Sequence, residues 1–224
     1  MSHYTIDVEN QRGANTTYAV MMDTPDFSGD HKPWLNVWYT AFVPFRGSFS
    51  VETGEDFYAW VGTVPTSPGP GVIVLNGMSL LAQLGSEGSP GSTFDMKVIE
   101  SFPTIEEIEP SATTGSYEVK TGTDFSMPNR TYLVGLAKVD NRGQVAPVGS
   151  VAPDNDQNIQ VTPKMRFFVA ESHQMSGEIV DRSAVERYGA VVDFSSGEGA
   201  GKFYATATQN QDGRFTVKYF DSPE

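Results

Sequence analysis

The stretch GSFSVETGEDF, residues 47–57, returns as GSYEVKTGTDF at residues 115–125. The second copy starts 115 − 47 = 68 residues after the first; seven of the eleven aligned positions are identical, and an eighth exchanges Phe49 for Tyr117. In each copy, apolar residues at every second position precede a Thr-Gly pair and an Asp-Phe pair. Such alternation is typical of a strand with one buried face, and Gly favours a chain reversal. The pattern therefore predicts a duplicated unit of strand, turn and strand.

Each copy leads into a further strand that runs from an aromatic residue to a glycine. These strands cover residues 58–62 and, after a short insertion, residues 132–135. A spacing of 68 residues is short for two separate immunoglobulin-type domains of about 100 residues each. We therefore predict a single β-sandwich domain over residues 1–224, with the pseudo-repeat at residues 47–62 and 115–135. Two small β domains, residues 1–90 and 91–224, are the alternative.

A period of two dominates the rest of the chain as well. It predicts strands that include residues 4–8, 16–22 and 35–43. Near the end of the chain, Asp212-Gly213 supplies the positive φ of a tight turn and predicts a hairpin of residues 202–209 with residues 214–220.

Helical signals are few. Residues 183–188 favour one short helix, which begins after a Ser cap and ends at Gly189. The acidic run at residues 105–110 indicates a solvated sheet edge, with a single helical turn as the alternative. About a dozen strands with little helix predict an all-β fold, an antiparallel β-sandwich of jelly-roll or immunoglobulin-like type.

Composition excludes several function classes. The 28 acidic and 15 basic residues give a formal charge of −13, which disfavours nucleic acid and anionic membrane surfaces as partners. The absence of Cys excludes disulfides, thiol nucleophiles and iron–sulfur ligation. No signal peptide is visible, and no apolar stretch approaches the about 20 residues of a spanning helix. We expect a soluble protein, either cytoplasmic or exported by a leaderless route.

Aromatic residues suggest a ligand-binding surface. Alternation places Asn36 and Trp38 on one face of their strand, and Tyr58 and Trp60 on one face of theirs. Aromatic rings stack on sugars and on other ligands with apolar faces. The candidate ligand-binding residues are Trp34, Asn36, Trp38, Tyr58 and Trp60. The alternative is that these aromatic side chains belong to the core or to a face hidden in a homo-oligomer.

Oxygen-bearing side chains crowd residues 154–158. Asp154, Asp156 and Asn158 are candidate ligands for Ca²⁺, which takes six to eight oxygen ligands. The stretch departs from the EF-hand pattern, so an Asx-rich turn is the alternative. The three histidines stand in no metal-binding spacing.

These features favour a non-catalytic protein that binds a ligand or assembles with itself. Its expected partners are a glycan or small ligand, recognised in a lectin-like way through the aromatic surface, or further copies of the chain. No Gly-x-Ser-x-Gly motif is present. The alternative is a small-molecule enzyme that uses carboxylates in an aromatic pocket. The candidates for that role are Asp23, Asp26, Glu171 and Asp193.

Overall fold

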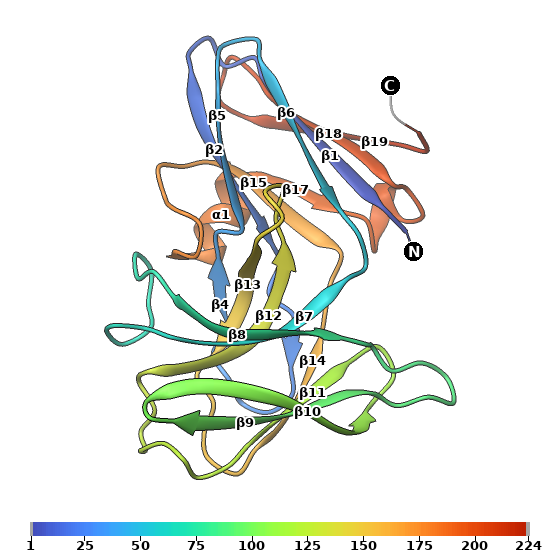
Figure 1. Ribbon diagram of the computed structural model, residues 1–224. Coiled ribbons are helices and arrows are strands. Elements are labelled where there is room, and N and C mark those ends of the chain that lie inside the picture. The colour runs from blue at the N-terminus through green and yellow to red at the C-terminus, as the bar shows by residue number, and fades with distance from the viewer. Residues whose placement is uncertain (1, 223–224) are drawn as a thin grey trace.

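The computed structural model describes residues 2–222, which form four β-sheets (Figure 1). The central sheet has the order β16 (Ile179–Val180), β4 (Trp34–Asn36), β13 (Val145–Val151), β12 (Tyr132–Val139), β7 (Phe57–Thr63) and β8 (Leu75–Ala82). Below it in Figure 1 lies the lower sheet, with the order β10 (Phe102–Ala112), β9 (Gly91–Ile99), β11 (Tyr117–Thr121), β14 (Asn158–Thr162) and β3 (Asp26–Phe27).

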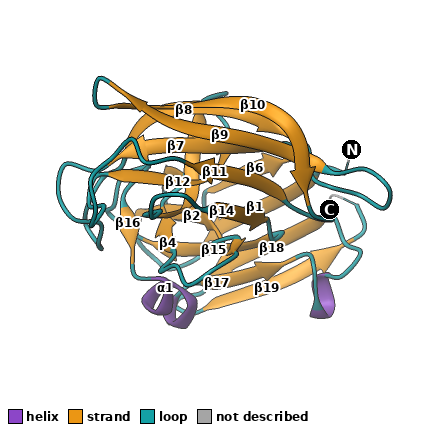
Figure 2. Cartoon of the chain, turned by 90° about the horizontal axis from the view of Figure 1, so that it is seen from below, coloured by secondary structure: helices purple, strands orange, loops and turns teal. Residues whose placement is uncertain are grey.

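Two four-stranded sheets form the other end of the molecule. One has the order β19 (Phe215–Phe220), β18 (Tyr204–Gln209), β1 (Tyr4–Asn10) and β6 (Ser48–Thr53). The other has the order β17 (Ala190–Asp193), β15 (Arg166–Glu171), β2 (Thr16–Met22) and β5 (Tyr39–Val43). In Figure 2 the sheets are stacked in layers, with β8 and β10 at one side and α1 (Arg182–Tyr188) at the opposite side.

The predicted all-β, sandwich-like class is confirmed. Most neighbouring strands are antiparallel, and the parallel pairs are β1 with β18 and β9 with β11. Assignment to a jelly-roll or immunoglobulin type stays a prediction. The main core is a continuous cluster of buried side chains that runs from Ile6 to Ala207 and receives residues from all four sheets.

The two copies of the repeat form β6 and β7 in the first case and β11 and β12 in the second. Within each copy the two strands belong to different sheets, so residues 54–56 and 122–131 lead the chain from one sheet to another and do not close a hairpin. We call these connections the first and the second arch. The copies meet in the central sheet, where β7 pairs antiparallel with β12 and Val61 lies opposite Val134.

Residues 35–43 do not form the single strand that alternation predicts. The chain leaves β4 at Asn36 and enters β5 at Tyr39, and these strands lie in different sheets. At the break, Val37 donates to Glu178 O and Trp38 donates to Val20 O, both with fully buried side chains. The prediction was wrong because a mostly apolar stretch is equally compatible with a strand and with a buried crossing between two sheets.

Three other local predictions can be compared with the structure. The hairpin of β18 and β19 is confirmed, with Gly213 at φ 83°. The acidic run lies in β10, an edge strand of the lower sheet. The helix also forms, but its cap is Asp181, whose side chain accepts hydrogen bonds from the backbone of Ser183 and Ala184. Aspartate ranks with serine as an N-cap, so the signal fits either residue.

The one α-helix among residues 2–222 has seven residues, and no helix there has the length and apolar character needed to cross a bilayer.

The glycine that ends each aromatic-to-glycine segment has no room for a side chain. A Cβ on Gly62 would lie 2.3 Å from Cζ2 of Trp60, and a Cβ on Gly135 would lie 2.0 Å from the carbonyl oxygen of Gly149. Such distances are far inside van der Waals contact. Glycine at these positions is therefore required by the close approach of neighbouring groups.

Gly135→Ala is expected to destabilise the protein by about 2 kcal/mol or more, because β12 and β13 would have to separate. Urea unfolding monitored by circular dichroism measures the change. Gly69→Ala is the matched control, since a Cβ there meets nothing within 4 Å. It is expected to change stability by less than about 0.5 kcal/mol. Equal stabilities of the two variants would contradict the packing argument.

Candidate functional site

The structure buries three of the five residues predicted to bind a ligand. Asn36, Trp38 and Trp60 are at most 1% exposed. Trp38 packs in the main core, with its ring 6.2 Å from that of Phe167. Asn36 donates to Gly177 O and accepts from Ser150. A ligand has no access to these side chains in this conformation.

The predicted shared face of Tyr58 and Trp60 does exist, but a second small core covers it. Val64 and Val74, from the segment between β7 and β8, pack there with Trp60, and Tyr58 packs against their edge. Trp34 also packs at the edge of this cluster, and the Lys32 ammonium lies 4.3 Å from the centre of its ring. The five residues therefore form no open aromatic platform.

The 154–158 segment serves the second arch. Thr121 Oγ1 donates to Asp154 O at 2.8 Å, and the backbone of Asp156 donates to Gly122 O at 3.1 Å. Within residues 2–222 no three His, Cys, Asp or Glu side chains converge to hold a metal ion. Asp154 and Asp156, which were predicted with Asn158 to bind Ca²⁺, thus gain no further carboxylate or imidazole there.

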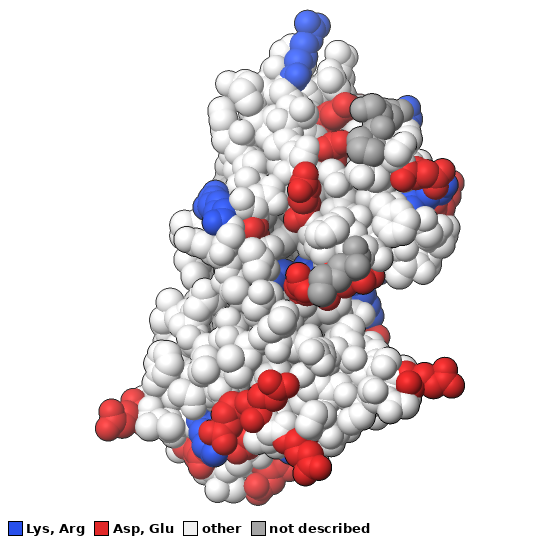
Figure 3. Space-filling model, turned by 45° about the vertical axis from the view of Figure 1, so that its right-hand side comes forward, with Lys and Arg blue, Asp and Glu red and all other residues white. Residues whose placement is uncertain are grey.

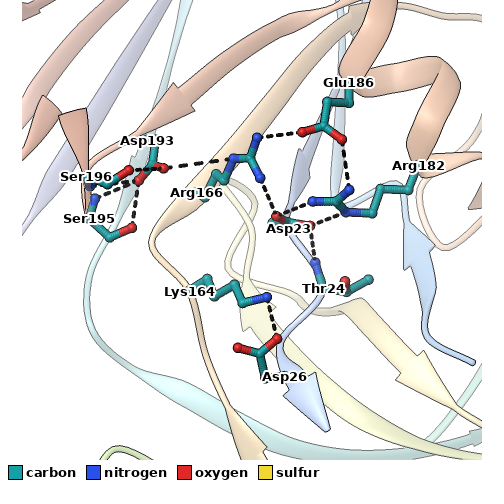
Figure 4. A network of polar contacts seen from close by, with 10 residues as sticks. All are labelled: Asp23, Thr24, Asp26, Lys164, Arg166, Arg182, Glu186, Asp193, Ser195 and Ser196. Atoms are coloured by element: carbon teal, nitrogen blue, oxygen red, sulfur yellow. Dashed lines mark hydrogen bonds and ion pairs between the residues drawn. The ribbon is translucent and has the colours of Figure 1, made fainter. Parts of the chain in front are cut away.

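Asp23, one of the carboxylates considered for catalysis, lies in a network of ion pairs (Figure 4). Its side chain is 1% exposed and accepts hydrogen bonds from Arg182 at 2.7 and 2.8 Å and from Arg166 at 3.3 Å. Glu186, one helical turn after Arg182 on α1, bonds both guanidinium groups. The hydrogen bond to Asp23 is the main cause that raises the pKa of Arg182. The two arginines also flank the buried ring of Phe168.

The other three carboxylates are partnered as well. Burial opposes ionisation of Asp193, but hydrogen bonds from Ser195 and Ser196 outweigh it and lower the pKa of the carboxyl. Asp26 pairs with Lys164, and Glu171 pairs with Arg12. A carboxyl group that exchanges protons near neutral pH needs an apolar setting without a cation. The geometry of these four residues therefore gives the enzyme alternative no support.

A cavity of about 510 Å³ lies beside the first arch. We call it the first arch cavity. Its apolar walls come from three separate parts of the chain. They consist of Phe57, Leu81, Ala82, Leu84, Pro163 and Met165. Glu55 and Asp56, both exposed, are the charged residues that line it. This size and composition are typical of sites for small ligands.

Lys138 on β12 binds the backbone of the first arch next to this cavity. Its ammonium donates to Gly54 O at 2.7 Å and to Asp56 O at 3.1 Å, and it lies 4.4 Å from the centre of the Phe57 ring. Burial lowers the pKa of Lys138 to about 8, although Asp56 and Glu55 favour its charged form. The lysine therefore fixes the backbone of the first arch and the wall formed by Phe57.

This cavity was not predicted from the sequence, and the repeat is the one sequence signal that lies beside it. Its Asp-Phe pair supplies Asp56 and Phe57, whereas Leu81, Leu84 and Met165 belong to segments with no distinguishing pattern. Lys138 also carries no signal in the sequence, since alternation alone does not show that a lysine is buried.

Comparison with known proteins adds one match. A family model described as RhiA matches residues 1–220, a range that contains both arches and every strand of the four sheets. No curated protein matches the chain, and neither does any solved structure.

In the unaltered protein the free energy of unfolding is expected to rise with pH above about 8, and Lys138→Met is expected to remove this rise. The side chain has a pKa of about 8 in the folded protein and of 10.5 when it is unperturbed. Between these values the unfolded chain holds a proton that the folded chain has released, so the free energy of unfolding rises with pH. Below a pH of about 8 both states hold the proton, and the slope disappears.

Urea unfolding of both proteins at several pH values from about 7 to about 9.5 tests this expectation. Burial raises the pKa of Tyr18 to about 12 and that of Tyr117 well above its usual value, which lowers stability at still higher pH in both proteins. The difference between the two profiles isolates Lys138. Parallel profiles would show that Lys138 does not titrate in this range.

Proposed function

The chain belongs to the RhiA family, and we propose that it functions as a binding protein for a small amphiphile with an apolar body and a protonated amine, held in the first arch cavity. One observation carries this proposal. The first arch cavity is lined by six apolar side chains, by Gln83 and by two carboxylates, Glu55 and Asp56, with no basic residue among its lining.

The chemistry of the walls selects the two ends of the ligand. Burial of an apolar body against Phe57, Leu84 and Met165 supplies the affinity. The carboxylates of Glu55 and Asp56 attract a cationic end and repel an anionic one. The face of the molecule in Figure 3 carries many carboxylates, and the formal charge of −13 favours approach of a cation over the whole surface.

Binding of the neutral fluorescent probe N-phenyl-1-naphthylamine tests the site. The measured quantity is the fluorescence emission of the probe, which increases when the probe enters an apolar cavity. Decylamine is expected to displace the probe more strongly than decanoate, which has the same chain length and the opposite charge. Leu81→Trp is expected to weaken probe binding at least about tenfold, because the indole occupies the cavity. Undiminished probe binding by this variant would overturn the assignment of the site.

The variant Glu55→Gln/Asp56→Gln is expected to reduce decylamine affinity by about three- to tenfold, the range for two exposed ion pairs. The matched control is Glu106→Gln/Glu107→Gln, which removes the same charge from exposed positions on β10. The control is expected to bind decylamine like the unaltered protein. An equal loss in both variants would assign the preference to overall charge and contradict a role for the two rim carboxylates.

Self-association is a second candidate, favoured by an exposed apolar patch where β8 and β10 meet. A Cβ on Gly77 of β8 would lie 3.0 Å from the ring of Pro103 on β10, so the two strands are in contact. Close to this contact, Leu75 and Phe102 are 54% and 52% exposed, and Met78 and Ile99 are exposed as well. Contiguous exposed apolar groups are typical of interfaces.

Light scattering is expected to give a mass of twice 24.4 kDa if a second copy covers this patch. Phe102→Lys is then expected to restore the monomer mass, because burying the ammonium opposes association. A monomer at every accessible concentration would remove this candidate and leave ligand binding unaffected.

A further inference from the structure

The second arch also borders a cavity. The repeat aligns Asp124 with Asp56 and Phe125 with Phe57, and both members of the second pair line a cavity of about 490 Å³. We call it the second arch cavity. Each copy of the duplicated unit thus places an Asp-Phe pair in the wall of a cavity beside its arch.

The walls of the second arch cavity differ in chemistry from those of the first. The insertion at residues 126–130 and the tip of the β9–β10 hairpin replace the apolar side chains. Hydroxyl groups of Ser101, Ser126 and Thr131 line the cavity, together with Glu100 and Arg130. The wall therefore offers hydrogen-bond donors and acceptors of mixed charge.

An aromatic pair contributes the apolar part of the wall. The rings of Phe125 and Tyr132 lie 5.7 Å apart, and Tyr132 is half-buried. Phe125 is almost completely buried and fixes the position of the tyrosine ring. A partly exposed tyrosine presents an apolar face together with a polar hydroxyl group.

The polar wall is also rigid. Asn129 donates to the carbonyl oxygens of Tyr132 and Pro153, both at 2.9 Å, and its Oδ1 accepts from the backbone of Thr131 and Tyr132. These four bonds fix the insertion before any ligand arrives. Preorganised groups bind more tightly because less conformational freedom is lost on binding.

A tight hairpin turn forms the other side of the cavity. Glu100 and Ser101 are the two residues between β9 and β10, and they have φ values of 50° and 68°. Positive φ at both central residues is typical of the short turn that joins two antiparallel strands. Here both residues line the second arch cavity.

We propose that the second arch cavity binds a neutral, polyhydroxylated ligand of monosaccharide size. A sugar ring has a C–H face that stacks on an aromatic ring and hydroxyl groups that need both donors and acceptors. Tyr132 supplies the ring, while Ser101, Ser126 and Thr131 supply groups that act as both donor and acceptor. The mixed signs of Glu100, Asp124 and Arg130 favour neither an anion nor a strong cation.

Saturation-transfer difference NMR with glucose, galactose, mannose and N-acetylglucosamine tests this proposal. At least one of these sugars is expected to bind with a dissociation constant of about 1 mM or below. Ser126→Trp places an indole in the cavity from an exposed loop position and is expected to weaken that binding at least about tenfold. Ser67→Trp, at another exposed serine, is the matched control and is expected to bind like the unaltered protein.

Failure of all four sugars to receive saturation would overturn the ligand class. Equal sugar binding by Ser126→Trp and the unaltered protein would overturn the site. The proposal is independent of the amphiphile site, because Leu81→Trp is expected to keep sugar binding and Ser126→Trp is expected to keep the uptake of N-phenyl-1-naphthylamine. The two cavities can thus fail or succeed separately.

Discussion

The packing of the central sheet depends on the indole ring of Trp60, which occupies the space left by the missing side chain of Gly62. Trp60 on β7 is paired with Gly135 on β12, and its ring occupies the space beside Gly62 on its own strand. Its Nε1 donates to Asn76 Oδ1 at 3.0 Å, so the one polar atom of the ring is satisfied. A side chain at Gly62 would meet the ring, whereas a side chain at Gly135 would meet the carbonyl oxygen of Gly149 on β13. Close packing in the central sheet therefore requires glycine at both positions.

Once β7 and β12 are paired, each arch has to lead from the central sheet to a different outer sheet. The carbonyl groups exposed at such a crossing need donors, because unpaired buried backbone groups are costly. The first arch receives them from the ammonium of Lys138. In the second, the backbone of Asp156 donates to Gly122 O, and Thr121 Oγ1 in turn donates to Asp154 O of the 154–158 segment. The same sequence pattern is thus stabilised in two ways. A buried lysine and an Asx-rich loop have the same structural task at the two positions.

Sequence periodicity was sufficient to predict the fold class, the strands of the repeat and the last hairpin, because these depend on which residues of one strand share a face. It was insufficient for residues 35–43, which are mostly apolar and suit a strand. Only the tertiary structure shows that the chain changes sheets at Val37 and Trp38. The predicted aromatic site depended on that strand and on an open face beside Trp60. Burial by a later segment, with Val64 and Val74, is a long-range property that alternation does not contain.

The two arch cavities show how a duplication yields sites of different chemistry. Each copy supplies the arch and one Asp-Phe pair, but most of each wall comes from segments outside the duplicated eleven residues. Leu81 and Met165 make the first cavity apolar, whereas the insertion and the β9–β10 tip make the second polar. The conserved part of the repeat therefore determines where a hollow forms, and the neighbouring segments determine what it accepts. Most of the difference in wall chemistry therefore comes from residues outside the eleven duplicated positions.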